Sequence, residues 1–169
     1  PSSAASDVYK RQEFISKKSA EKFYGMLTDT EIDCETLFMS GDSSIWERQK
    51  IIEKLSKLKS VILVATQVIE AGVDIDMDIG YKDCSKLDSE EQFMGRINRS
   101  CKGEGIVYFF NLDSARMVYK DGDIRVDTEF TVMKTDMQEI LRTKNFSDYY
   151  GEILEIDRNN KKRLQTSNF

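Results

Sequence analysis

Three polar side chains lie at a spacing that could hold a polyphosphate. Gln92, Arg96 and Arg99 fall at i, i+4 and i+7, so on a helix all three would share one face. An arginine fork matches phosphate oxygens bidentately, and an arginine that stabilises a transferring γ-phosphoryl group raises its rate by about 10³–10⁵. Arg96 and Arg99 are therefore the candidate catalytic residues. The competing interpretation is a solvated basic helix face paired with Glu90 or Glu91.

A second group of polar residues directly follows the apolar run 61–65. Thr66 and Gln67 offer a hydroxyl and an amide where the phosphates of a nucleic-acid backbone could approach. Gly72 would let the chain pass close to a ligand, and Asp74 could accept a hydrogen bond from a ribose hydroxyl. An ordinary transition from strand to loop with surface carboxylates explains the same residues equally well.

Alternating strand and helix patterns would position these two groups. Uninterrupted apolar runs predict strands buried in a parallel sheet, and apolar residues at helical spacing predict the helices between them. The expected elements are a helix over 16–27, a strand over 35–39, a helix capped by Ser44 and Glu47, a strand over 61–65, a helix from Asp88 to about Arg99 and a strand over 106–110. The fold class is therefore α/β, and ligands of such sheets bind beyond the carboxyl ends of the strands.

The two ends of the chain carry weaker patterns. Residues 1–12 have no periodicity, so we expect a tail that does not belong to the fold. The α/β domain is then expected over 13–127, truncated at its start and lacking the strand that should precede the first helix. Residues 128–169 are expected to form a helical extension, with helices over 129–142 and 147–158 and a polar tail from Asn159.

Composition excludes several classes of protein. The chain has 169 residues, which suits one domain, and it contains no histidine, which excludes histidine-dependent triads and zinc sites. Its three cysteines lie far apart, which disfavours a disulfide framework, and we expect no metal site within the chain. A net charge of −5 argues against nucleic-acid binding through a broadly basic surface. No apolar run is long enough to span a membrane, so no membrane partner is expected and the cytoplasm is the expected location.

Residues 66–76 and 92–99 resemble motifs V and VI of superfamily 2 helicases, at the interval those enzymes show. The wording V-A-T-Q-V-I-E-A-G-V-D-I-D, followed by D-S-x-x-Q-x-x-G-R-x-N-R, is closest to the CRISPR-associated helicase-nuclease of type I systems. The stretch 39–48 is similar to the motif IV region of that family, and 145–150 resembles the helical segment after its motor. Most DEAD-box relatives differ, with glycine in place of Asn98 and histidine in place of Gln92.

The resemblance implies the fold of a second RecA-like domain, a P-loop NTPase-type parallel sheet flanked by helices, and a role for each matched residue. Arg96 and Arg99 would face the γ-phosphate of ATP across a cleft between domains. The remaining residues form two groups: Gln92, Gly72, Asp74 and Gly95 at the nucleotide, and Thr66, Gln67, Ser40 and Arg48 on the strand backbone. The implied partners are single-stranded DNA, the first RecA-like helicase domain and a CRISPR surveillance complex.

Two sequence signatures of such motors are absent. The chain has no G-x-x-x-x-G-K-[ST] phosphate loop and no Asp-Glu metal motif. The resemblance therefore implies that ATP and Mg²⁺ are held mainly by the first domain, and that this chain alone has negligible ATPase activity.

Two other functions remain open at this stage. The chain could be part of another superfamily 2 DNA or RNA helicase, because motifs V and VI contact backbone and nucleotide rather than base edges. It could also be a RecA-like interaction module without catalysis. Aromatic side chains such as Trp46 and Phe93 could stack on bases, but we expect them to pack in the core.

Overall fold

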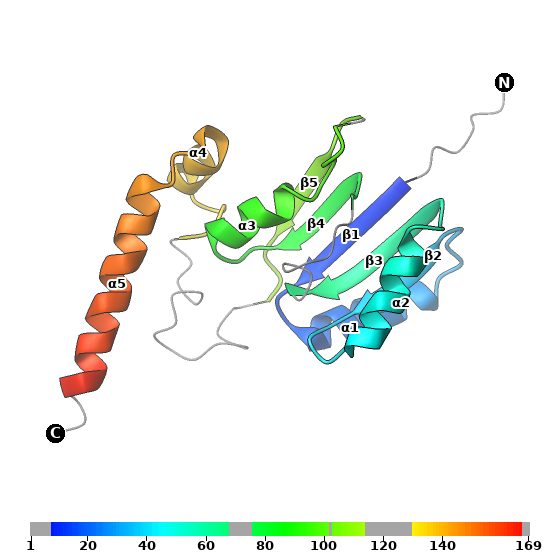
Figure 1. Cartoon of the computed structure of the whole chain (residues 1–169), viewed down its shortest axis with the longest axis horizontal. Helices are drawn as coiled ribbons and strands as arrows, with labels where there is room; N and C mark the ends of the chain where they lie inside the picture. Colours follow the sequence, from blue (N-terminus) through cyan, green and yellow to red (C-terminus); the bar gives the residue numbers. More distant parts are fainter. Residues whose placement is uncertain (1–7, 68–75, 102, 114–129, 167–169) are drawn as a thin grey trace.

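A computed structural model describes residues 8–67, 76–101, 103–113 and 130–166. They form a parallel sheet of five strands in the order β2-β3-β1-β4-β5, with helices on both faces (Figure 1). The elements of this layer are β1 (Val8–Phe14), α1 (Lys17–Thr28), β2 (Glu35–Met39), α2 (Ile45–Leu55), β3 (Ser60–Thr66), β4 (Ile79–Asp83), α3 (Leu87–Met94) and β5 (Ile106–Phe110). Two further helices follow, α4 (Thr135–Thr143) and α5 (Ser147–Thr166). The predicted α/β fold with a parallel sheet is confirmed.

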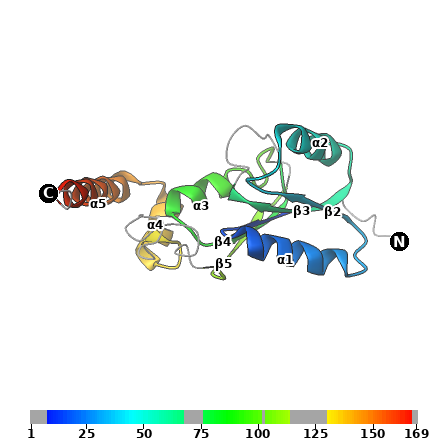
Figure 2. The same ribbon diagram turned by 90° about the horizontal axis from the view of Figure 1, so that it is seen from below.

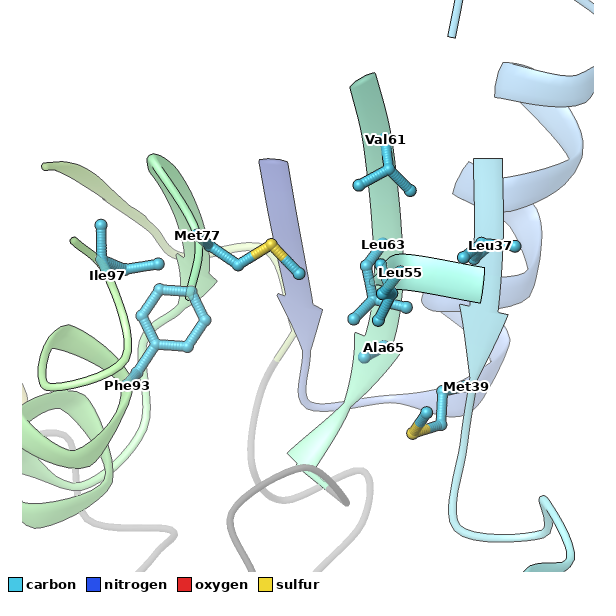
Figure 3. Packing of buried hydrophobic residues seen from close by; sticks show 9 residues of the cluster. All are labelled: Leu37, Met39, Leu55, Val61, Leu63, Ala65, Met77, Phe93 and Ile97. Atoms are coloured by element: carbon cyan, nitrogen blue, oxygen red, sulfur yellow. The ribbon is translucent and has the colours of Figure 1, made fainter. Parts of the chain in front are cut away.

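The two faces of the sheet carry different helices. Figure 2 shows α1 on one face and α2 with α3 on the other. Beneath α2 and α3 lies the larger core cluster, in which Leu55 of α2 packs with residues of β2 and β3, and Phe93 of α3 lies beside Met77 and Ile97 (Figure 3). Beneath α1, Phe14 and Val64 pack with Ala20. Both faces of the central strands are thus buried, as a doubly wound sheet requires.

The predicted helix starts are correct for the first two helices. The Ser16 hydroxyl accepts from the Ser19 amide at 3.2 Å and caps α1. In α2 the Ser44 hydroxyl accepts from the Glu47 amide at 3.2 Å, and the Glu47 carboxylate accepts from the Ser44 amide at 2.7 Å, which completes the capping box.

The prediction of a tail over 1–12 is wrong for residues 8–12, because β1 begins at Val8. This strand pairs with β3 on one side and β4 on the other, so it is the central strand of the sheet. The strand expected to be missing before α1 is therefore present. Strand β4 was not predicted either.

Charged residues explain why both strands escaped prediction. Arg11, Glu13 and Lys82 are almost fully buried, where apolar residues are expected in a parallel strand. Glu13 of β1 lies opposite Lys82 of β4 and forms ion pairs with both Lys82 and Arg11. Because buried charges are tolerated when they are paired, these strands read as polar yet form the centre of the sheet.

The helix predicted from Asp88 to about Arg99 is wrong at both ends. Helix α3 begins at Leu87, after Lys86, whose side chain makes no capping hydrogen bond, and it ends at Met94, with Gly95 as its C-cap. The chain then turns away, and Asn98 adopts a left-handed backbone conformation with φ of 51°. Residues 95–100 are consequently a turn rather than a continuation of the helix.

The C-terminal helices pack on α3. Phe130, Val132, Met137, Leu141 and Tyr149 are buried together with Cys84 and Leu87, which flank the start of α3. Helix α5 continues through Thr166, so the polar tail expected from Asn159 is wrong up to that residue. Figure 1 shows α5 extending from α4 away from the sheet. The boundary expected between residues 127 and 128 lies outside the described residues. Among those residues, no helix has both the length and the apolar character needed to cross a bilayer.

Candidate functional site

The turn after α3 is held by hydrogen bonds along its whole length. The amides of Gly95, Arg96 and Ile97 donate to carbonyls of α3 at 2.9 to 3.1 Å. The Asn98 amide donates to the Met77 carbonyl at 2.6 Å. With every N–H from 95 to 98 engaged, the backbone that carries Arg96 has a defined path.

Asp76 joins the two predicted motifs. Its carboxylate accepts from the Arg99 amide at 2.7 Å and from the Ser100 amide at 3.0 Å. Asp76 is the last residue of the segment 66–76, and Arg99 is the last residue of the segment 92–99. The ends of the two motifs therefore lie in contact. Sequence reasoning did not foresee this role for Asp76.

The predicted arrangement of Gln92, Arg96 and Arg99 on one helical face is wrong, because α3 ends before Arg96. Gln92 and Arg99 are exposed, whereas Arg96 is half-buried. A Cβ added at Gly95 would have its nearest neighbours at 3.6 Å. The described packing would therefore tolerate a side chain at position 95.

The conformation of Asn98 explains why asparagine can stand where most DEAD-box proteins have glycine. Its φ of 51° is one that glycine adopts freely and that asparagine tolerates better than other side chains. The Asn98 amide group also donates to the Gly103 carbonyl at 2.6 Å and accepts from the Gly103 amide at 3.3 Å. Asparagine therefore permits the turn and also closes the loop that leads to β5.

The predicted strand-binding residues lie at the opposite end of the sheet from the arginines. Thr66 ends β3 and is buried, and Gln67 is half-buried. Ser40 follows β2, which pairs with β3 so that Met39 lies opposite Ala65. These residues are at the carboxyl ends of the strands, whereas Ile97 is bridged to Met77, just before the start of β4. Gly72 and Asp74 lie outside the described residues.

Ser40 and Arg48 are engaged within their own loop. Ser40 is buried, and its hydroxyl accepts from the Asp42 amide at 3.3 Å. The Arg48 guanidinium donates to the carbonyl of Ser43 at 2.9 Å and to that of Gly41 at 3.0 Å. Arg48 therefore fixes the loop between β2 and α2, while a guanidinium has further donors that could reach a phosphate.

Trp46 was expected in the core, and this expectation is wrong. Its side chain lies on the first turn of α2 and is 62% exposed, beside Ile45 at 77%. The ammonium of Lys50 lies 3.4 Å from the centroid of the indole ring. The capping box places α2's first turn directly after the Ser40 loop, and this was the available sequence signal for an exposed aromatic at the carboxyl end of the sheet.

Helix α3 is anchored to the sheet through Phe93. The Arg11 guanidinium lies 4.7 Å and the Lys82 ammonium 5.5 Å from the centroid of the Phe93 ring. A Cβ added to Gly80 of β4 would come within 2.5 Å of Phe93 and 2.9 Å of Ile97. Glycine is therefore required at position 80 for α3 and its turn to approach the sheet this closely.

Comparison with known proteins places the chain among helicase domains. The family model described as CRISPR-associated nuclease/helicase Cas3, C-terminal, matches residues 16–102. A CRISPR-associated nuclease/helicase Cas3 of Methanothermobacter thermautotrophicus (strain Delta H) is 27% identical over 99 residues, which cover 59% of this chain and 11% of that protein. The chain thus spans about a tenth of the length of this curated relative.

Solved structures share the fold. T. fusca Cas3 with ADP matches 92% of this chain and 22% of its own, with 16% identity and a TM-score of 0.59. The C-terminal domain of the DEAD-box protein Dbp5 matches 66% of each chain, with 19% identity and a TM-score of 0.52. The Mycobacterium smegmatis helicase Lhr, bound to single-stranded DNA and AMP-PNP, matches 83% of this chain and 18% of its own, with 17% identity and a TM-score of 0.53.

Proposed function

Because this chain belongs to the family of C-terminal domains of the CRISPR-associated nuclease/helicase Cas3, we propose that it is the ATP-responsive half of a DNA motor in antiviral defence. The fold is that of the second RecA-like domain of a superfamily 2 helicase. The proposed activity is ATP-driven translocation on single-stranded DNA or its unwinding. It requires a first RecA-like domain that binds most of the nucleotide.

The contact between Asp76 and the turn over residues 95–100, here called the arginine turn, carries this proposal. It ties the segment that starts at the strand-binding residue Thr66 to the turn that presents Arg96 and Arg99. In this proposal the contact joins the turn assigned to the nucleotide to Asp76, the last residue of the segment assigned to the DNA. Closure of a cleft by a ligand that binds two states unequally is how such a change becomes movement.

The residues divide into two roles. Arg96 and Arg99 would stabilise charge on the γ-phosphate, while the exposed residues Gln92 and Gly95 would receive the nucleotide. Thr66, Gln67 and the loop fixed by Arg48 would hold the DNA backbone at the carboxyl ends of the strands. Mg²⁺, held mainly by the first domain, would neutralise the phosphates. Gly72 and Asp74 keep their proposed place at the nucleotide.

The partners follow from the same assignment. A CRISPR surveillance complex would deliver single-stranded DNA to the motor, and this work would take place in the cytoplasm. The net charge of −5 fits a protein that grips DNA locally between two domains rather than over a basic surface.

Arginine substitutions test the proposal in a protein that joins this chain to its first RecA-like domain. Arg96→Ala or Arg99→Ala should lower DNA-stimulated ATP hydrolysis at least about 10³-fold. Arg99→Lys should also be impaired, because an ammonium lacks the planar fork. Arg142→Ala, in an exposed pair with Glu139 on α4, is the matched control and should leave turnover unchanged.

Full turnover in the Arg96→Ala and Arg99→Ala variants would favour an interaction module without catalysis. A strong preference for RNA over DNA as the stimulating strand would favour another superfamily 2 helicase. The isolated chain should hydrolyse ATP negligibly with single-stranded DNA present, and robust hydrolysis by these residues alone would contradict the division of roles.

A further inference from the structure

The C-terminal helices contact α3 through its acidic residues. The Glu90 carboxylate is fully buried and accepts from the Ser85 amide at 3.1 Å and the Val132 amide at 2.9 Å. It therefore bridges the start of α3 to residue 132 of the C-terminal segment. The Lys144 ammonium lies 3.4 Å from the Glu91 carboxylate at the surface of the same contact.

Tyr149 makes the second buried contact. Its side chain is 1% exposed, and its hydroxyl donates to the Asp88 carboxylate at 2.9 Å and accepts from the Asp88 amide at 3.5 Å. Burial, and then the Asp88 charge, raise the pKa of the Tyr149 hydroxyl, which therefore stays a neutral donor. The ring packs edge-on against Phe130 and Phe146, with centroids 6.0 and 5.9 Å away.

Helix α3 transmits this contact to the arginines by a short path. The helix has eight residues, and Gly95 follows it directly as the C-cap. The amides of Gly95 and Arg96 donate to the carbonyls of Glu91 and Phe93. A shift of α3 along its axis would therefore move the backbone of Arg96, because no flexible linker separates them.

We propose that the segment 130–166 is a positioning element of the motor: Glu90 and Tyr149 fix α3, and through α3 they fix the turn that presents Arg96 and Arg99. This inference rests on the proposed function only for its consequence on ATP hydrolysis. The mechanical part, that undocking at Glu90 or Tyr149 loosens residues 95–100, stands on the geometry alone.

The Glu90 and Tyr149 contacts lie in an interface that is otherwise apolar. The apolar cluster around Leu87 and Met137 already buries the interface. A buried carboxylate that accepts two amides instead fixes direction and register, because each hydrogen bond has a narrow geometry. These contacts therefore set where α3 lies along the extension.

Hydrogen exchange in this chain tests the mechanical part. Tyr149→Phe keeps the ring and removes the hydroxyl. Glu90→Gln replaces one of the two carboxylate oxygens, each of which accepts from a backbone amide, by an NH₂ group that can only donate. Both should speed exchange of the amides of residues 95–100 by about tenfold, because each substitution leaves a buried hydrogen-bonding group without its partner. The amides of β3 should keep wild-type rates. Glu152→Gln, exposed on α5, is the control.

A second measurement uses the protein with both RecA-like domains. Tyr149→Phe should lower kcat for ATP hydrolysis about tenfold with an unchanged KM, because a displaced arginine acts on the transition state. Faster exchange in the C-terminal helices with unchanged rates at 95–100 would overturn the inference. So would an unchanged kcat in a protein that Arg99→Ala inactivates. Should Arg99→Ala itself remain active, the proposed function fails independently of the exchange result.

Discussion

Asn98 and Gly95 in the arginine turn differ in how strictly the local structure requires them. Asn98 is required by a left-handed backbone and by its two hydrogen bonds to Gly103. Gly95 has no such local requirement, since a Cβ there would make only ordinary contacts. Asn98 therefore shapes the turn, whereas the described packing does not require glycine at position 95.

Trp46 yields a prediction at this scale. Single-stranded DNA bound at the carboxyl ends of the strands should stack a base on its exposed ring, with Lys50 beside a phosphate. Trp46→Ala should weaken DNA binding by about 1–3 kcal/mol, the usual contribution of base stacking. Its free energy of unfolding should change by less than about 0.5 kcal/mol, because the side chain is exposed.

Fluorescence titration of the two-domain protein with oligonucleotides would measure the binding change. Met26→Ala, another exposed apolar residue on α1, is the control and should bind DNA normally. Equal affinities for the Trp46→Ala variant and the unaltered protein would rule out stacking on this ring.

Elements differed in how well the sequence predicted them. Helical spacing of apolar residues after Ser16, the capping box of Ser44 and the apolar runs of β2, β3 and β5 gave correct helices and strands. Helix α3 was predicted too long, because the sequence pattern does not reveal that Asn98 takes a left-handed conformation. The contact of Asp76 with the turn could not be predicted, because hydrogen bonds to backbone amides leave no side-chain pattern.

The central strand shows a second limit of sequence reasoning. β1 and β4 have no apolar periodicity because their shared centre is the ion pair of Glu13 and Lys82. Pairing of two charged residues 69 positions apart depends on the register of strands that must first be known. The sheet was therefore predicted as a class, and its central strand was missed.

Glu13→Gln gives the prediction at the scale of elements. The substitution removes the carboxylate that Arg11 and Lys82 share, and breaking a buried ion pair costs about 3–5 kcal/mol. Urea unfolding should show a loss of that order. Glu35→Gln breaks the exposed pair with Lys54 and should cost less than about 1 kcal/mol. Equal losses in both variants would mean that the buried pair contributes nothing special.

At the scale of the whole molecule, stability should fall as pH rises from about 4.5 to about 7. Burial, and to a lesser degree the Asp88 charge, raise the pKa of Glu90 from 4.5 to about 7, although the Ser85 and Val132 amides and Lys82 oppose the shift. Over this interval the unfolded chain has lost the proton that the folded chain keeps, so the folded state is progressively disfavoured. The total effect of Glu90 is roughly 3 kcal/mol, and it is complete above pH 7.

Urea unfolding between pH 4.5 and 8 would measure this dependence, and Glu90→Gln should reduce its slope by about 1.4 kcal/mol per pH unit. Burial also raises the pKa of Asp83, so a weaker slope of the same sign should remain in the variant. Parallel curves for the variant and the unaltered chain would show that Glu90 does not titrate in this range.

The reactivity of Cys84 can report the rate at which the C-terminal segment undocks. Its thiol is buried beneath Phe130 and Tyr149, and burial raises its pKa to about 12. The thiolate is the form of cysteine that attacks alkylating reagents, so this sulfur should not be alkylated while the helices stay in place. Cys101, exposed directly after the arginine turn, would be labelled first and would give the starting time of the reaction. The rate of alkylation of Cys84, measured by mass spectrometry, would then report how often the C-terminal segment separates from the rest of the domain, without any engineered probe.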